Sequence, residues 1–146
     1  MKYKFKFQRI LDVKETQEEN KKNQIAEVRA KIAELDSKVK ELEMMRKEWS
    51  DSLKNSLDTG LTIKEIREAK QYEEAIDNRI IQVKKEIEVQ EVILNKKREE
   101  YLELRKEKKS FESLKEKDFD RYKYSEMKKE EALVDQIVTF NKFKGK

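Results

Sequence analysis

The residues in this sequence that suit catalysis are carboxylates, and they occur without the usual catalytic partners. Adjacent pairs such as Glu18-Glu19 and Glu99-Glu100 are the type of group that general acid–base catalysis uses. The chain has no His and no Cys, which excludes imidazole and thiolate catalysis, disulfides and the usual zinc ligands. Its two glycines are too few for a phosphate-binding loop. Because 47% of the residues are charged, such pairs are typical of a solvated helix face. We therefore expect no enzyme, no cofactor and no metal.

Lysine and arginine suit a second kind of chemistry, the binding of phosphate. The net charge is +4, with +4 over residues 1–14, −4 over residues 15–95 and +4 over residues 96–146. A nucleic-acid site needs a basic stripe that acidic residues do not interrupt. The basic residues of the last third instead alternate with Glu at helical spacing, as in Glu112, Lys115 and Glu116. We therefore expect no nucleic-acid partner.

Long helices are the elements that must carry these charges. Hydrophobic residues make up 36% of the chain, there is no Pro, and the apolar residues recur at alternating steps of three and four. This spacing is the pattern of a coiled coil. A first series comprises Ile25, Val28, Ile32, Leu35, Val39, Leu42, Trp49 and Leu53, and a second comprises Ile76, Ile80, Val83, Ile87, Leu94, Tyr101, Leu104 and Phe111.

A turn separates the two series. Asp58-Thr59-Gly60 contains a glycine, which ends helices readily, and Thr62 with Glu65 forms the pattern of a capping box. Because a short turn makes two helices antiparallel neighbours, the sequence predicts an all-α fold, a two-helix antiparallel coiled-coil hairpin. We expect a single domain over residues 1–146, with helices over about 9–57 and 62–142 and the turn at about 58–61. Turning near Gly60 pairs residues whose numbers add up to about 119.

The predicted arms are unequal, so the second helix protrudes at its C-terminal end. Residues after Phe111 have no expected partner in the first arm. The apolar seam also weakens towards this end, because Glu18 and Lys21 occupy seam positions. Two interpretations stay open: a frayed, solvated helix, or an interface that another protein completes.

Apolar residues in excess of the seam predict binding surfaces. Near the turn these are Leu42, Met45, Trp49, Tyr72 and Ile76, of which Leu42, Trp49 and Ile76 are equally well explained as seam residues. Met45 and Tyr72 lie off the seam and favour an interface. A second stripe follows the protruding helix, with self-association as its simpler explanation; its members are Phe119, Tyr122, Leu133, Ile137 and Phe140.

Three segments carry a recognisable pattern: Phe5-x-Phe7-x-x-Ile10-Leu11-Asp12 near the start, the basic residues 105–117 in the second predicted helix, and residues 130–140 near the end. In this order they resemble the opening pattern, the basic mid-helix segment and the close of the flagellar export protein family FliJ. The resemblance implies a cytoplasmic adaptor, or stalk, that is peripheral to the inner face of the cell membrane at the flagellar base. It implies as partners the export ATPase FliI, its regulator FliH, the export-gate protein FlhA and export chaperones that the protein escorts.

The resemblance also implies where two of these partners bind. The gate-binding patch of the family maps onto Leu42, Met45, Trp49, Tyr72 and Ile76. We expect the ATPase to bind the protruding helix, through Phe119, Tyr122, Leu133, Ile137 and Phe140. No segment approaches the roughly 20 apolar residues of a membrane span, so we expect a soluble protein without direct membrane insertion. The alternative function is a structural coiled-coil spacer that associates only with itself.

Overall fold

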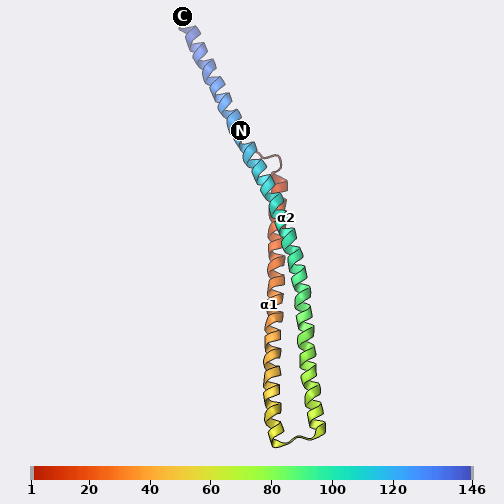
Figure 1. Cartoon of the computed structure of the whole chain (residues 1–146). Coiled ribbons are helices and arrows are strands. Elements are labelled where there is room, and N and C mark those ends of the chain that lie inside the picture. The colour runs from red at the N-terminus through yellow and green to blue at the C-terminus, as the bar shows by residue number, and fades with distance from the viewer. Residues whose placement is uncertain (1, 146) are drawn as a thin grey trace. The chain divides into compact units, whose positions relative to one another are not determined.

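The computed structural model describes residues 2–145, and over that range the chain forms two α-helices and no strand. Helix α1 is Gln8–Thr59, with 52 residues, and helix α2 is Ile63–Lys144, with 82 residues. The two helices pack against each other on either side of the turn (Figure 1), which confirms the all-α hairpin with unequal arms. The extension of the hairpin over a single domain stays a prediction.

The turn between the helices depends on one glycine and one threonine. Gly60 has φ +93°, a left-handed conformation that side chains with a Cβ rarely adopt. A Cβ at Gly60 would meet open space, so the backbone angle, and not crowding, requires glycine there. Thr62 then caps α2, because its hydroxyl Oγ1 accepts a hydrogen bond from the backbone N–H of Glu65 at 3.2 Å. The local sequence therefore ends one helix and starts the next within three residues.

The chain divides into two compact units, and the first comprises Lys21–Glu100 with the turn; we call it the turn unit. Its core is a narrow seam in which Val83 is fully buried. Lys21 pairs with Glu100, and the ring of Trp49 contacts that of Tyr72, so paired residue numbers add up to 121. This register differs by two from the expected one. The other seam residues that are at most 8% exposed are Ile25, Val39, Ile76 and Leu94.

The second unit comprises Met1–Asn20 and Tyr101–Lys146; we call it the terminal unit. Its buried residues are Phe5, Leu11 and Glu18, all on the N-terminal side. Residues 2–7 precede α1 and lie along α2, which continues past them towards its C-terminal end, drawn in blue in Figure 1. From residue 127 to residue 145 every side chain is exposed, so this segment is not buried against any other part of the described chain.

Candidate functional site: protein-binding surfaces

The first candidate surface lies near the turn, on the turn unit. Tyr72 is 46% exposed and Met45 is 39% exposed, whereas Trp49 and Leu42 are half-buried. The ring centroids of Trp49 and Tyr72 lie 4.4 Å apart, so these two side chains form one aromatic surface across α1 and α2. Ile76 is 6% exposed and belongs to the seam beneath them. Of the five residues that the sequence grouped, Met45, Trp49 and Tyr72 line one hollow, whereas Ile76 has almost no surface to offer a partner.

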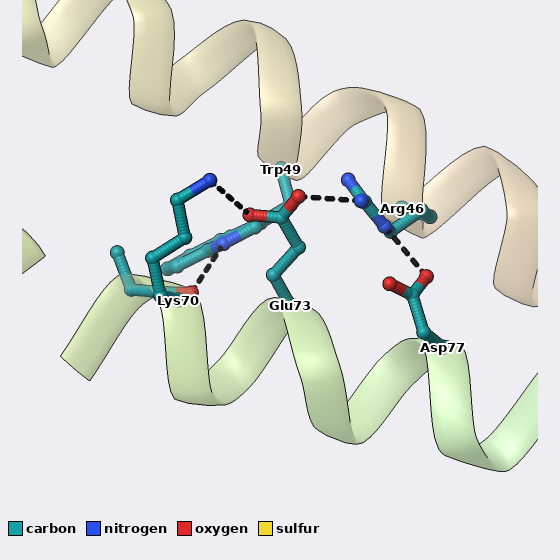
Figure 2. A network of polar contacts seen from close by, with 6 residues as sticks. Arg46, Trp49, Lys70, Glu73 and Asp77 are labelled. Carbon is teal, nitrogen blue, oxygen red and sulfur yellow. Dashed lines mark hydrogen bonds and ion pairs between the residues drawn. The ribbon is translucent and has the colours of Figure 1, made fainter. Parts of the chain in front are cut away.

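A polar network holds this aromatic surface in place (Figure 2). Arg46 of α1 pairs with both Glu73 and Asp77 of α2, and its Nε donates to Asp77 Oδ1 at 2.7 Å. The pKa of Arg46 is raised, chiefly by the hydrogen bond to Asp77. The indole Nε1 of Trp49 donates to the backbone oxygen of Ala69 at 3.2 Å. These bonds across the two helices fix the orientation of the Trp49 ring, which apolar spacing alone does not predict.

A groove adjoins the aromatic surface on the side of the turn. Its volume is about 310 Å³, and Leu53, Leu61 and Ala69 line it together with Trp49 and Tyr72. Sequence analysis placed Leu53 in the seam and did not use Leu61. Leu53 sits at a heptad position like a core leucine, and Leu61 lies in the turn between the helices, so helical spacing identifies neither as a groove residue.

The second candidate surface belongs to the terminal unit and begins with an aromatic cluster. The ring of Tyr3 lies 5.1 Å from that of Phe119 and 5.3 Å from that of Tyr122. The Tyr3 hydroxyl donates to Asp118 Oδ2 at 2.8 Å. Burial of the hydroxyl, with the hydrogen bond and charge of Asp118, raises the pKa of Tyr3 to about 12.

This cluster corrects the expectation that α2 has no intrachain partner after Phe111. The N-terminal segment extends the packing, because the ring of Phe7 lies 6.2 Å from that of Phe111 and Tyr3 reaches Phe119 and Tyr122. The aromatic residues that alternate with Lys in residues 2–7 suggest that this segment packs somewhere, but their spacing does not say against which part of the chain. Phe119 keeps 37% of its surface exposed, so a partner still has access to it.

The polar seam positions form ion pairs across the two helices, which contradicts the frayed helix that the sequence left open. Glu18 is 8% exposed, and its Oε2 pairs with Lys108 Nζ at 2.5 Å. Tyr101 donates a further hydrogen bond to Glu18 Oε1 at 3.4 Å. The hydrogen bond to Glu18 is the main cause of the raised pKa of Lys108. Because a buried carboxylate needs such partners, this part of α1 is not frayed, and the interface with another protein stays a prediction. In the turn unit, Lys21 is likewise paired with Glu100, at 2.6 Å.

Beyond the aromatic cluster, α2 carries large apolar side chains that nothing in the chain covers. Leu133 is 58% exposed, Ile137 is 52% exposed and Phe140 is 61% exposed. Sequence analysis missed three neighbours of the same kind, because it followed a single stripe. These are Val134, Val138 and Phe143, and they are 49–83% exposed. The apolar surface of this segment is therefore broader than predicted.

Residues 2–145 contain no group of three or more acidic residues placed to hold a metal ion. Neither helix, over the same residues, contains a stretch of the length and hydropathy needed to cross a membrane. What the surfaces do offer is clustered apolar and aromatic side chains, which are the usual features of protein–protein contacts. Fold and surfaces together define a helical-hairpin protein suited to binding other proteins.

Comparison with known families identifies the group to which this hairpin belongs. The family model described as "Flagellar FliJ protein" matches residues 3–145. The chain therefore belongs to the flagellar FliJ family, as its sequence motifs suggested, and is a component of the flagellar export apparatus, in which the family is non-catalytic. No curated protein and no solved structure matches the chain significantly.

Proposed function

We propose that this chain is an adaptor that connects the hexameric export ATPase FliI with the export-gate protein FlhA. In this proposal, FliH and export chaperones are further partners, and the protein acts at the inner face of the cell membrane at the flagellar base. The single observation that carries the proposal is the uncovered apolar surface of residues 127–145 in a member of an export family.

The ATPase is the partner proposed for the terminal unit. An isolated helical segment without packing is only marginally stable in water, so a partner is needed to hold residues 127–145 in place. A single slender helix fits the central opening of a ring-shaped hexamer. Leu133, Ile137 and Phe140 supply apolar contacts, and Phe119 and Tyr122 contribute from the cluster with Tyr3. The +4 charge of residues 96–146 adds a salt-dependent attraction if the opening is acidic.

The gate protein is the partner proposed for the turn unit. Met45, Trp49 and Tyr72 present a combined apolar surface, and Trp and Tyr are enriched among residues that dominate binding energy. Leu42 lies half-buried at the edge of this surface, and Ile76 supports it from the seam. The network of Arg46 keeps the surface ordered before binding, which lowers the entropy cost of association.

A truncation tests the ATPase assignment. A chain that ends at residue 126 loses only exposed side chains, so the hairpin and the Tyr3 cluster remain intact. We expect the full chain to stimulate ATP hydrolysis by purified FliI and the truncated chain to lose this stimulation. A full-length control with Val89→Ser and Val92→Ser removes two exposed valines elsewhere on α2 and keeps the stimulation. Full stimulation by the truncated chain would show that residues 127–145 are not the ATPase site.

The same exposed segment favours one other function, a spacer that associates with itself. Apolar side chains that are 49–83% exposed also suit a contact between two copies of the chain. Sedimentation equilibrium over a range of concentrations separates the two functions. A dimer that disappears on truncation, in a protein that does not bind FliI, would favour the spacer.

A further inference from the structure

The groove next to Trp49 is one of three hollows that adjoin one another near the turn. Trp49, Ser52 and Tyr72 line both this groove and a hollow that extends towards Met45. Ser52 and Ser56 line both the groove and a third hollow on the outer side of α1. Shared lining residues make the three hollows one continuous surface feature, which we call the turn groove.

The charged residues that line the turn groove are all acidic. Glu65 and Glu68 of α2 line the hollow with the apolar floor, and Glu48 and Asp51 of α1 line the hollows that adjoin it. No Lys or Arg lines any of the three hollows. This sign is opposite to the net charge of the chain, which is +4. The local potential therefore favours a cation at the groove although the protein as a whole repels one.

These four carboxylates are also unpaired, in contrast to those of the seam. Glu73 and Asp77, a turn or two further along α2, both bind Arg46. Within the part of the chain that the structure describes, none of the four groove carboxylates forms an ion pair with Lys or Arg. A carboxylate that has no internal partner retains its full capacity to bind a cation from another molecule.

The floor between the carboxylates is apolar and carries the strongest anchors of the turn unit. Trp49 and Tyr72 form one wall, and Leu53 and Leu61 complete the floor. A volume of about 310 Å³ accommodates one or two bulky aliphatic side chains of a partner. The apolar floor therefore suits apolar side chains of a ligand, and the carboxylates suit its basic groups.

We propose that the turn groove binds an amphipathic basic segment of a partner protein. One or two aliphatic side chains of this segment insert between Trp49 and Leu61, and Lys or Arg residues on either side pair with the groove carboxylates. The inference rests on the proposed function in so far as the groove shares Trp49 and Tyr72 with the gate-binding surface. It adds the chemical nature of the partner segment, which the apolar surface alone leaves open.

The fluorescence of Trp49 reports binding directly, because it is the one Trp in the chain. The probe is a synthetic helical peptide with leucines on one face and lysines flanking them, and its counterpart has every Lys replaced by Glu. We expect the Lys peptide to shift the Trp49 emission in a saturable, salt-sensitive manner, and the Glu peptide to have no effect. Absence of a shift with the Lys peptide would overturn the proposal.

A pair of matched variants separates binding in the groove from general attraction between charges. Glu65→Gln with Glu68→Gln removes two carboxylates without changing the floor. We expect it to weaken binding of the Lys peptide about threefold to tenfold, as for partly exposed ion pairs. Glu88→Gln with Glu91→Gln removes two exposed carboxylates at the same spacing elsewhere on α2 and leaves binding unchanged. Equal effects of the two variants would place the peptide outside the groove and refute the inference.

The gate protein itself distinguishes failure of this inference from failure of the proposed function. If a fragment of FlhA binds the chain but tolerates Glu65→Gln with Glu68→Gln and high salt, the proposed function stands and the basic segment is wrong. If the Lys peptide binds in the groove but FlhA does not bind at all, the groove chemistry stands and the gate assignment is wrong. Association of the chain with itself through the groove, detected by sedimentation, would replace the partner with a second copy and overturn the proposal.

Discussion

The ion pair between Glu18 and Lys108 gives the sharpest quantitative prediction about the terminal unit. Replacing Lys108 by Met keeps most of the aliphatic stem and removes the cation that pairs with Glu18 Oε2 at 2.5 Å. Glu18 keeps the hydroxyl of Tyr101 at 3.4 Å, which cannot neutralise its charge. The variant therefore removes a positive charge that compensates the Glu18 carboxylate, which is buried in the seam.

The loss of unfolding free energy caused by Lys108→Met should lie between two known limits. Breaking a fully buried ion pair costs about 3–5 kcal/mol, whereas an exposed pair contributes about 0–1 kcal/mol. The side chains of Glu18 and Lys108 are 10% and 22% exposed, so water reaches one end of this pair. We expect Lys108→Met to lower the free energy of unfolding by about 1–3 kcal/mol. For a chain of this size, that corresponds to a fall in Tm of roughly 2–12 °C.

A double-mutant cycle measures the pair without the other effects of each substitution. Urea unfolding followed by circular dichroism gives the free energies of Glu18→Gln, Lys108→Met and the double variant. We expect a coupling free energy of about 1–2 kcal/mol between Glu18 and Lys108. A variant in which both are replaced by apolar residues, Glu18→Leu with Lys108→Met, should be as stable as the natural chain. The control pair is Lys128 with Glu131, which is 3.7 Å apart, more than half exposed, and expected to couple by less than ~0.5 kcal/mol. Equal coupling in both pairs would refute the burial argument.

Three further predictions concern the seam, the N-terminal segment and the gate surface. Val83→Ala, at a fully buried seam position, should lower the free energy of unfolding by about 1–3 kcal/mol in the same assay, and no loss would mean that the seam is not packed there. Neutral Tyr3 stabilises the docking of the N-terminal segment, and docking raises the pKa of Tyr3 from 10.0 to about 12. The contribution of Tyr3 to the free energy of unfolding is therefore complete below about pH 10 and is lost as the pH rises through about 12. Absorbance of tyrosinate and stability measured over this range should show the effect, and Tyr3→Phe should abolish it. Met45→Ala with Tyr72→Ala should weaken FlhA binding by ~2 kcal/mol or more. Loss of the contact between Tyr72 and Trp49 should lower the free energy of unfolding by only about 0.5–1.5 kcal/mol, and a larger loss of stability with unchanged FlhA affinity would make both residues core.

The hairpin was predictable from the sequence because its causes are local. Apolar residues at steps of three and four, the glycine at position 60 and the cap at Thr62 each act within a few residues. The predicted pairing of residues across the hairpin was wrong by two positions. Heptad spacing determines which faces of the two helices meet, but it determines less well how far one helix is shifted along the other. Partners across the hairpin were harder to predict. Glu18 looked like a weak seam position because its partner, Lys108, is 90 residues away and follows the same charged pattern as its neighbours.

For the candidate surfaces too, local spacing predicted which residues are exposed but not which distant residues they contact. Sequence analysis predicted that Met45 and Tyr72 are exposed, and they are. It left Ile76 open between core and interface, and only the packing of α1 against α2 places it in the seam. The docking of Tyr3 on Phe119 required knowledge of where the chain preceding α1 travels, which no periodic pattern specifies. The turn groove depends on side-chain geometry and was not predictable from spacing.

The central claim, that the C-terminal segment of α2 binds the export ATPase, is tested most directly by calorimetric titration of purified FliI. The variant carries Leu133→Ser, Ile137→Ser and Phe140→Ser, three exposed positions whose replacement leaves the hairpin intact. If these residues dominate the contact, the loss of ~2 kcal/mol or more weakens binding about 30-fold or more. The Val89→Ser, Val92→Ser control should bind FliI as tightly as the natural chain. Unchanged affinity of the triple variant would contradict the claim.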